Sequence, residues 1–569
     1  MHWRVSEEIN PEQKEELSSY SELTAQLLVN RNITSKQQAR DFFASGLGAL
    51  NNYNLLPNIK AAAEAVIAAV KRQQKIYIYG DYDVDGVCAT SILFDFLYRK
   101  LGADVLPYIP SRFEEGYGMS RQGLDKILQE GGKLVITVDC GIRDAALIDE
   151  YVEKGLQFIV TDHHSLPERD NLPLSALAIV HPALPDSKYP VSAICGTTVA
   201  WKLVQKLAEL ALVQNLILRN LVPDEYLDLV ALATVCDIMP LQNENRSLVK
   251  LGLKKLNRDP NPGLAQLIKI AELQGKEITV YHLGFVLGPR INAGGRISHA
   301  IDCVRLLTTK NQEKLFEIAA MLNRLNLERQ KLTEAMLNEA EESIDIKVDT
   351  RLLFVSGKDW AEGVIGLVAG KLTEKYNLPS VAISIGKDGE AKGSARSIKN
   401  FNITEAISYS SELLIRYGGH AQAAGFTLET KNLQLLQDSL EDIAGRELKP
   451  KQLQRELVID KALSLDEVDM ETVKEINQFE PFGMGNPQPV FSLNGVTVKN
   501  IKQIGQDRSH VKLEILQKGN RIEAIAFNMA AEFAKVAAGD KIDIAGNLSA
   551  DAWNGKERIQ LKVRDFKNA

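Results

Sequence analysis

The residues best suited to chemistry lie in one short acidic segment, Asp81-Tyr82-Asp83-Val84-Asp85-Gly86. The segment places three carboxylates within five residues, and only Gly80 separates it from the apolar run 76–79. Negative charge concentrated in this way is costly unless cations neutralise it, and carboxylate oxygens suit hard divalent ions such as Mg²⁺ and Mn²⁺. Taken alone, the segment is as typical of a solvated Asp/Gly turn as of a metal site, because Asp-rich turns are common.

Two further apolar runs end in residues that can bind metals. The run 134–138 leads into Asp139, and the run 158–161 leads into Asp162-His163-His164. Each run has the length and apolar content of a buried parallel strand. Ligands collect at the carboxyl ends of parallel strands, so we expect these segments to meet in one crevice. The residues expected there are Asp81, Asp83, Asp85, Asp139, His163 and His164, with Asp237 as a further candidate after an apolar helical segment.

Such a cluster of aspartates and histidines can hold one or two divalent cations. The cations would lower the pKa of bound water and clamp both oxygens of a phosphoryl displacement. An aspartate-rich donor set favours Mn²⁺ or Mg²⁺ over zinc. The side chains of His163 and His164 diverge because they are adjacent, so one could bind metal while the other contacts phosphate or shuttles a proton. A purely structural histidine pair is the alternative.

Composition narrows the class of protein. The chain has 569 residues, 45% of them hydrophobic and 25% charged, which is ordinary for a globular protein of several domains. A net charge of −7 excludes a generally basic nucleic-acid binder but permits a locally charged groove. Five cysteines without a Cys-x-x-Cys pair indicate reduced thiols. With neither a signal-peptide pattern nor an apolar membrane span, we expect a cytoplasmic protein.

Hydrophobic periodicity divides the chain into five regions. An α/β pattern surrounds the acidic segment, and a second one follows a long stretch without Gly or Pro whose apolar residues recur at helical spacing. Alternating runs near the C-terminus predict a small antiparallel barrel with one short helix near 530–538. The expected regions are an N-terminal helical segment (1–60), a catalytic α/β domain (61–305), a connecting helix (306–346), a second α/β domain (347–450) and an oligonucleotide-binding barrel (456–569).

Three polar, glycine-containing stretches suit an anionic polymer. They lie at 288–296, 393–397 and 418–420. Glycines around an arginine let backbone amides and the guanidinium approach a phosphate closely, although each stretch alone is also typical of a plain turn. Trp360 and Tyr417 could stack on bases, but an isolated aromatic residue near apolar ones is usually part of a core.

These motifs, in this order, resemble the DHH phosphoesterase superfamily. The match rests first on Asp81–Gly86 and Asp162-His163-His164. Later motifs narrow the resemblance to the RecJ family of bacterial single-stranded-DNA-specific exonucleases. The matching stretches are 233–240 with Asn245-Arg246, 288–296, Trp360 with 363–366, 393–397, 418–420 and 481–487.

The resemblance implies a DHH domain, a long connecting helix, a DHH-associated domain and an OB barrel. It implies 5′-to-3′ hydrolysis of single-stranded DNA to 5′-mononucleotides in recombination and repair, with Mn²⁺ or Mg²⁺ as two ions. The implied partners are single-stranded DNA, a single-strand-binding protein and a helicase. No membrane association is implied. The implied site residues are Asp81, Asp83, Asp85, Asp139, His163 and Asp237 as metal ligands, His164, Asp139 and Asp83 as catalytic residues, and Arg290, Asn292, Arg296, Ser394, Arg396 and His420 as contacts to DNA and phosphate.

Two positions depart from the family pattern. Ala361 follows Trp360 where many relatives have histidine, which puts a polar role at position 361 in doubt. The stretch Ala293-Gly294-Gly295 has glycine where a second alanine is expected, and we expect this change to add only backbone freedom.

Two other functions remain open at this point. A DHH hydrolase could act on short oligonucleotides, cyclic dinucleotides or inorganic pyrophosphate, but such enzymes are much shorter and lack the segment 481–487 and the barrel. A catalytically silent DNA-binding scaffold is the other alternative. Silent relatives usually lose metal-binding acids, whereas this chain has the full set.

Overall fold

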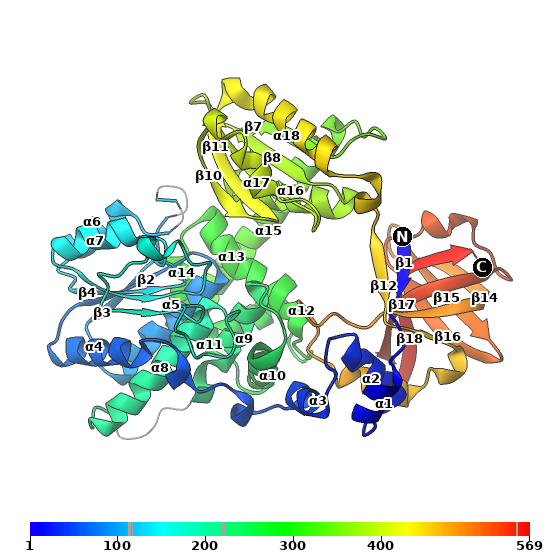
Figure 1. The fold of residues 1–569 in the computed structure, drawn as a ribbon, viewed down its shortest axis with the longest axis horizontal. Coiled ribbons are helices and arrows are strands. Elements are labelled where there is room, and N and C mark those ends of the chain that lie inside the picture. The colour runs from blue at the N-terminus through cyan, green and yellow to red at the C-terminus, as the bar shows by residue number, and fades with distance from the viewer. Residues whose placement is uncertain (112–114, 117, 218–222, 554–555, 569) are drawn as a thin grey trace.

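The computed structural model describes every residue except 112–114, 117, 218–222, 554–555 and 569. Figure 1 shows two α/β lobes, one at the left and one at the top, and a barrel lobe at the right that carries both chain termini. The long helix α15 (Gln312–Ser343) joins the two α/β lobes. Among the described residues, no helix combines the length and apolar character needed to cross a membrane.

The first lobe contains a parallel sheet with the strand order β3-β2-β4-β5-β6. Its central strands are apolar runs with both faces buried, as expected of parallel strands. One face packs on α4 (Ile59–Lys71), α5 (Val84–Asp95) and α8 (Gly196–Val213). The other face packs on α6 (Arg121–Gln129) and α7 (Ala145–Glu153). The strands are β2 (Ile76–Gly80), β3 (Val105–Tyr108), β4 (Leu134–Val138), β5 (Gln157–Thr161) and β6 (Ala178–Val180).

The register of this sheet aligns the ends of four strands. Gly80 pairs with Val138, Val138 with Thr161, and Thr161 with Val180. The residue after each of these positions therefore lies on the same edge of the sheet. The chain runs from β2 to β3 on one side and then returns to β4 on the other, so the strand order reverses beside β2. Such a reversal opens a crevice at the carboxyl ends of the strands.

Helices complete the first lobe on the side of α15. Helix α9 ends immediately before Asp237, and α13 lies between the first sheet and the second lobe (Figure 1). These helices are α9 (Leu227–Cys236), α10 (Asn243–Arg258), α11 (Pro262–Ile270), α12 (Val280–His282), α13 (Gly288–Ile297) and α14 (Ile301–Thr308).

The second lobe is a mixed sheet with the order β10-β11-β9-β8-β7, in which only β7 and β8 are parallel. Helix α16 covers one face, and α17 and α18 pack on the other. The elements are β7 (Leu353–Lys358), α16 (Glu362–Tyr376), β8 (Ser380–Ile385), β9 (Glu390–Arg396), α17 (Ile403–Ser408), β10 (Leu414–His420), β11 (Ala423–Glu429) and α18 (Leu433–Glu447).

The C-terminal lobe is a barrel because its first long strand also pairs with β17, which closes the sheet. In place of the helix expected near 530–538 there is a single 3-10 turn, Glu532–Lys535. The lobe contains β12 (Glu456–Ile459), β13 (Lys461–Leu463), α19 (Met470–Asn477), β14 (Phe491–Ile504), β15 (His510–Gln517), β16 (Asn520–Ala526), β17 (Lys541–Trp553) and β18 (Lys556–Asn568).

The N-terminal segment shares the core of this barrel lobe. Strand β1 (His2–Val5) pairs in parallel with β12, and Leu17, Leu27 and Leu28 are fully buried against barrel residues. The segment expected to be helical therefore also contains a strand, which only a distant partner could reveal. Its helices are α1 (Pro11–Glu16), α2 (Glu22–Val29) and α3 (Lys36–Phe43).

A buried arginine joins the N-terminal segment, the barrel lobe and the first α/β lobe. Arg246 on α10 donates to the carbonyl oxygens of Phe42 at 3.0 Å, Phe479 at 2.6 Å and Gln478 at 3.0 Å. Its guanidinium also lies 4.1 Å from the centre of the Phe42 ring. Burial lowers the pKa of Arg246 to about 10, so the side chain remains a cation at neutral pH. This one side chain satisfies carbonyl groups from two segments far apart in the sequence.

We therefore expect Arg246→Ala to loosen the junction between the lobes. The substitution leaves three carbonyl oxygens without their donor, and breaking a buried hydrogen-bond network of this kind costs about 3 kcal/mol or more. Calorimetric melting should show a lower first transition in the variant. The control is Arg305→Ala, since the Arg305 side chain is 64% exposed. Equal temperatures of the first transition in the two variants would contradict a role for Arg246 in joining the lobes.

Candidate metal centre

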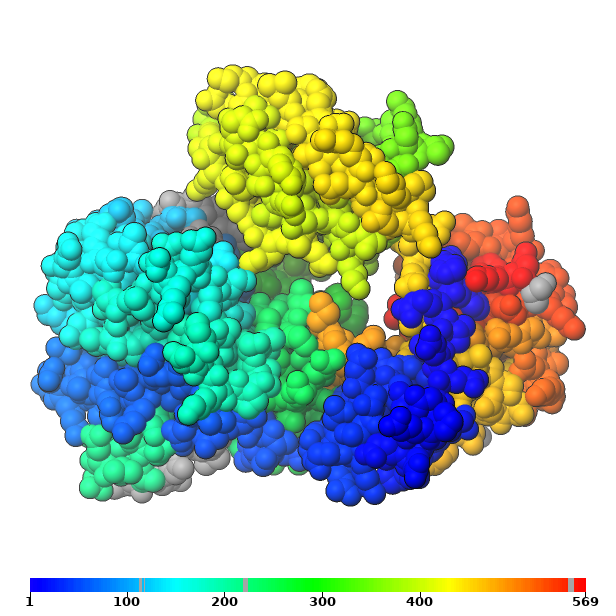
Figure 2. All heavy atoms as spheres, in the orientation of Figure 1, coloured from blue at the N-terminus to red at the C-terminus, as the bar shows by residue number. Residues whose placement is uncertain are grey.

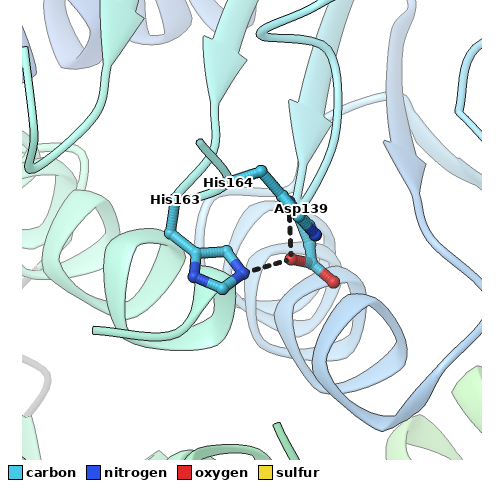
Figure 3. A group of neighbouring side chains, drawn as sticks. All are labelled: Asp139, His163 and His164. Atoms are coloured by element: carbon cyan, nitrogen blue, oxygen red, sulfur yellow. Dashed lines mark ion pairs between the residues drawn. The ribbon is translucent and has the colours of Figure 1, made fainter. Parts of the chain in front are cut away.

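The predicted acids and histidines meet at the crevice beside β2. Asp81 follows β2, Asp139 follows β4 and His163 lies two residues after β5, while Asp237 follows α9. Figure 3 shows Asp139 between His163 and His164, with ion pairs from both rings to its carboxylate. The crevice expected from the strand pattern therefore forms.

His163 is at the centre of the cluster. Its Nε2 lies 3.1 Å from Asp139 Oδ1, 3.5 Å from Asp237 Oδ2 and 3.6 Å from Asp85 Oδ2. Three overlapping groups of donor atoms each lie within 4.8 Å of one another. These groups are Asp81 with Asp83 and Asp139, Asp139 with His163 and His164, and Asp85 with His163 and Asp237.

The donor atoms fit a divalent cation. Asp139 Oδ1, His163 Nε2 and Asp237 Oδ2 are buried, and among the described residues they approach one another at 3.1 and 3.5 Å but make no hydrogen bond. Buried polar atoms are nearly always satisfied, so three such atoms facing one point indicate a missing ligand. A set of carboxylates with one or two imidazoles suits Mn²⁺ or Mg²⁺.

The electrostatics of the cluster lead to the same conclusion. Burial, followed by repulsion from neighbouring carboxylates, raises the pKa of Asp139 well above its usual range and that of Asp237 to about 9. Burial and the Asp85 carboxylate also raise the pKa of Asp83. Without a cation, Asp237 would hold a proton at neutral pH. A divalent ion stabilises the ionised forms and displaces the protons.

Local backbone geometry aims these side chains. Asp139 has a φ of 62° and Ile238, which directly follows Asp237, has a φ of 56°. A β-branched residue in this left-handed region is an outlier, and such strain gathers at functional sites. Asp83 begins α5 by accepting the N–H groups of Asp85 at 2.8 Å and Gly86 at 3.1 Å through one oxygen. Its other oxygen is not used by this cap.

Asp85 differs from the other acids because α8 engages both of its oxygens. Oδ2 accepts the N–H of Gly196 at 2.6 Å, and Oδ1 accepts that of Thr197 at 2.8 Å. The carboxylate is favoured there because the N-terminus of a helix is electropositive. Asp85 therefore fixes the start of α8 against the metal centre, in addition to facing His163.

The sequence motif contains a further acid, Asp162, that was not among the predicted site residues. Its Oδ1 accepts the N–H of His163 at 2.7 Å and lies 2.8 Å from His164 Nδ1, while Oδ2 accepts the N–H of Ile142 at 3.0 Å. Burial opposes ionisation of Asp162, but these bonds, led by that to His164, lower its pKa to about 2. Asp162 thus orients the His164 ring. The position of Asp162 between a predicted strand and the His pair could have identified it from the sequence.

A cavity of about 510 Å³ lies between the first and second lobes. Tyr82 of the acidic segment lines one side, and Arg296, Ser394 and Arg396 of the predicted phosphate contacts line it as well. Arg296 also donates to the carbonyl oxygen of Gly363 at 3.1 Å, which links α13 to α16. Two further basic lining residues, Lys392 and Arg416, were not predicted, although each lies just before one of the glycine-containing stretches. Tyr417, which the sequence offered for stacking on bases, also lines the cavity.

The remaining predicted DNA contacts lie elsewhere. Arg290, Asn292 and His420 are not among the described residues that line this cavity. Arg290 is half-buried on α13 and donates to Asn323 at 3.1 Å and to the Val286 carbonyl at 2.7 Å. His420 is exposed at the end of β10, and Asn292 is partly buried on α13.

The sequence left open that each glycine-containing stretch is a plain turn, but all three lie in helices or strands. Residues 288–296 lie in α13, 393–396 in β9 and 418–420 in β10. The expectation that Gly294 adds only backbone freedom is wrong, because Gly294 is helical. A Cβ there would lie 2.6 Å from Cys303 Sγ, so this glycine supplies space between α13 and α14. Trp360 is part of the core, and its indole donates to Glu339 at 2.9 Å.

The close approach of α8 to Asp139 predicts a sensitive position. A Cβ on Gly196 would lie 2.7 Å from Asp139 Oδ1. We expect Gly196→Ala to displace this carboxylate and to weaken Mn²⁺ binding about tenfold, as outer-shell changes do. Isothermal titration calorimetry measures the affinity. Gly445→Ala is the matched control, because a Cβ on Gly445 meets nothing within 4 Å; equal affinities in the two variants would refute the prediction.

The raised carboxyl pKa values also predict how stability depends on pH. A carboxyl whose pKa is raised in the folded state stabilises the fold below about pH 4, and this stabilisation is lost as pH rises through about 9. The metal-free protein should therefore melt at lower temperature as pH rises, whereas Mg²⁺ should oppose this loss. The melting temperature in Mg²⁺ minus that in EDTA should widen between about pH 6 and pH 9. A constant difference would contradict the prediction.

Three family models match the chain in order. They are the DHH family, N-terminal domain, over residues 75–234, the DHHA1 domain over residues 349–446, and the RecJ OB domain over residues 459–565. The matched ranges fall on the first lobe, the second lobe and the barrel.

Relatives and solved structures extend the similarity to the full chain. The single-stranded-DNA-specific exonuclease RecJ of Bacillus subtilis is 36% identical over 548 residues, covering 95% of this chain and 67% of the relative. The protein of the same name from Escherichia coli is 31% identical over 571 residues, covering 97% and 98%. The crystal structure of RecJ from Thermus thermophilus in complex with Mn²⁺ matches with a TM-score of 0.84 at 29% identity, covering 100% of this chain and 80% of that one. The similarity spans the metal centre, the inter-lobe cavity and the barrel, and this chain belongs to the RecJ family.

Proposed function

We propose that this protein is a metal-dependent exonuclease specific for single-stranded DNA, which removes 5′-mononucleotides from the 5′ end. One observation carries the proposal. A cluster of acids and histidines suited to divalent cations lies beside a cavity lined by arginines, and Tyr82, between Asp81 and Asp83 in the sequence, lines that cavity. Family membership supports the reaction class, because relatives are named single-stranded-DNA-specific exonucleases. The reaction belongs to DNA recombination and repair.

The residues of the metal centre divide into holders and orienting groups. Asp81, Asp83, Asp85, Asp139, His163 and Asp237 would hold the cations, and Asp85 would also hold α8 against them. The cations would activate water and stabilise the charge that develops on the phosphate. We propose two ions, since the three donor groups overlap at Asp139 and His163. Solved structures of RecJ from T. thermophilus with Mn²⁺ and with Mg²⁺ support the choice of these metals. His164, oriented by Asp162, would donate to a phosphate oxygen or move a proton.

The cavity suits the end of a strand better than its middle. Its volume of about 510 Å³ is in the range of small-ligand sites, which matches a nucleotide-sized group. Arg296, Ser394 and Arg396 offer a cationic and hydrogen-bonding wall for a terminal phosphate. A phosphate held there would place the adjoining nucleotide toward Tyr82 and the metal centre. Arg290, Asn292 and His420 would contact the backbone farther along the strand.

The arrangement of the lobes suits a single strand. Figure 2 shows an opening bounded by the second lobe above, the first lobe at its left, β12 and β1 at its right, and the N-terminal segment below. A strand that enters the metal centre through a narrow passage excludes a duplex sterically, and its bases can stack without sequence preference. By family resemblance we also propose a single-strand-binding protein and a helicase as partners, and a cytoplasmic location.

The direct test is the hydrolysis of end-labelled single-stranded DNA and of matched duplex in Mn²⁺, Mg²⁺ and EDTA. We expect 5′-mononucleotides from single strands only, and none in EDTA. Asp139→Ala should abolish hydrolysis but retain most single-strand binding, because the cavity and the barrel are unchanged. Cleavage confined to di- and trinucleotides would favour a short-substrate hydrolase. Binding without cleavage in every metal would favour a silent scaffold.

The barrel offers a surface for the longer strand. A cavity of about 750 Å³ on β14, β15, β16 and β18 is lined by two acidic and four basic side chains, the latter being Lys502, Lys512, Arg521 and Arg558. Lys512 pairs with Glu523 at 3.0 Å and Arg521 with Glu514 at 3.4 Å. Lys502 and Arg558 are exposed and belong to none of the described ion pairs. These two residues are therefore the better candidates for phosphate contacts.

Reversing these two charges should weaken the binding of long single strands. Removing two phosphate contacts lowers the slope of log K against log salt by about 1.4. Lys502→Glu with Arg558→Glu tests this by fluorescence anisotropy across salt concentrations. The double variant Lys60→Glu with Lys71→Glu on α4 carries the same charge change far from the barrel. Deleting the barrel would be a poorer test because the N-terminal segment shares its core. Equal slopes of log K against log salt in the two double variants would show that this surface does not contact the strand.

A further inference from the structure

A fourth polar residue lies on the edge of the sheet that forms the metal centre. Val180, the last residue of β6, is in register with Thr161, Val138 and Gly80. The residues that follow these four positions are His181, Asp162, Asp139 and Asp81. His181 is fully buried, with 0% of its surface exposed. It thus occupies the same topological position as three residues of the site, although no motif surrounds it.

The hydrogen bonds of His181 define its state. Its Nδ1 accepts the N–H of Ala183 at 3.1 Å, so this nitrogen carries no proton. The proton of the neutral ring is therefore on Nε2, which donates to the backbone carbonyl oxygen of His164 at 2.8 Å. Burial also lowers the pKa of His181, in agreement with a neutral ring. Both ring nitrogens are satisfied, one by its own strand end and one by the DHH segment.

His181 and Asp162 hold the DHH segment from opposite sides of its backbone. Asp162 accepts the N–H groups of His163 and His164 at 2.7 and 3.1 Å. His181 donates to the carbonyl group of His164. The bond from Asp162 N–H to the Val180 carbonyl at 3.3 Å brings the start of the segment to the same strand. Every peptide group between residues 162 and 165 is thereby tied to a buried partner.

We propose that His181 is a positioning residue that fixes the backbone of His164 and, through it, the directions of the His163 and His164 rings toward the metal centre. The proposal rests on the proposed function and deepens it, because it assigns a role at the same site. His163 Nε2 lies 3.1 Å from Asp139 and 3.5 Å from Asp237, so a small rotation of the segment changes both distances. An outer-shell partner of this kind is expected to affect metal affinity.

Two variants separate the two hydrogen bonds of the ring. His181→Gln places its amide nitrogen near the position of Nε2 and can donate to the His164 carbonyl, but it does not reproduce Nδ1. His181→Asn places its amide oxygen near Nδ1 and can accept from Ala183, but it is too short to reach His164. His181→Leu removes both bonds. A purely structural role would rank the variants by stability, without regard to which bond each retains.

The primary measurement is Mn²⁺ affinity by isothermal titration calorimetry, with melting temperature and single-strand binding recorded in parallel. We expect the Mn²⁺ affinity of the Gln variant to remain within about threefold of that of the unsubstituted protein, whereas the Asn and Leu variants lose about tenfold or more in affinity. Hydrolysis should follow the same order through kcat rather than through KM for DNA. Because metal affinity is measured without hydrolysis, this order tests His181 even if the proposed nuclease activity is not found.

Equal affinities in the Gln and Asn variants would overturn the proposal, as would unchanged affinity in a folded Asn variant. If Asn and Leu fail to fold, the Gln variant decides alone. The Gln variant restores only the bond to His164. If it keeps its Mn²⁺ affinity and kcat, the positioning role is supported, whereas a tenfold loss of affinity in a folded Gln variant refutes it.

Discussion

The concentration of buried carboxylates at one edge of a parallel sheet is the constraint on which the rest of the site depends. Asp81, Asp139 and Asp237 come from separate segments, and their mutual repulsion in a buried crevice is unfavourable without a cation. The surrounding structure holds them in spite of this cost. The left-handed backbone at Asp139, the engagement of Asp85 by α8 and the absence of a side chain at Gly196 all serve that end.

The three lobes place different tasks around this centre. The first lobe supplies the donors for the cations, and the second lobe supplies the arginine and serine that line the adjoining cavity. The barrel carries the surface, with Lys502 and Arg558, that we propose for the longer strand. The buried guanidinium of Arg246 ties α10 of the first lobe to the N-terminal segment and the barrel lobe.

Local patterns explain what the sequence could predict. The apolar runs before Asp81 and Asp139 became β2 and β4 at nearly their expected bounds, and the long helix spans Gln312–Ser343 where 306–346 was expected. The family, the two α/β domains and the barrel were confirmed by the family models and solved relatives. The roles of individual site residues stay predictions, although the structure brings the acids and His163 together.

The features that sequence reasoning missed depend on long-range contacts. Strand β1 forms because β12, more than four hundred residues away, offers it an edge. Residues 288–296 form a helix because tertiary packing against α15 overrides their glycine content. His181 is recognisable only when the register of β6 is known, since a single buried histidine has no pattern of its own.

The measurement that tests the central claim most directly is an anomalous difference map from crystals of this protein soaked in Mn²⁺. Strong peaks should lie within coordination distance of Asp139 and of His163 Nε2, with Asp237 and the acidic segment completing the shell. Peaks at this crevice that disappear in the Asp139→Ala protein would establish the metal centre. An ordered crevice without a peak, in crystals that bind Mn²⁺ elsewhere, would contradict the account.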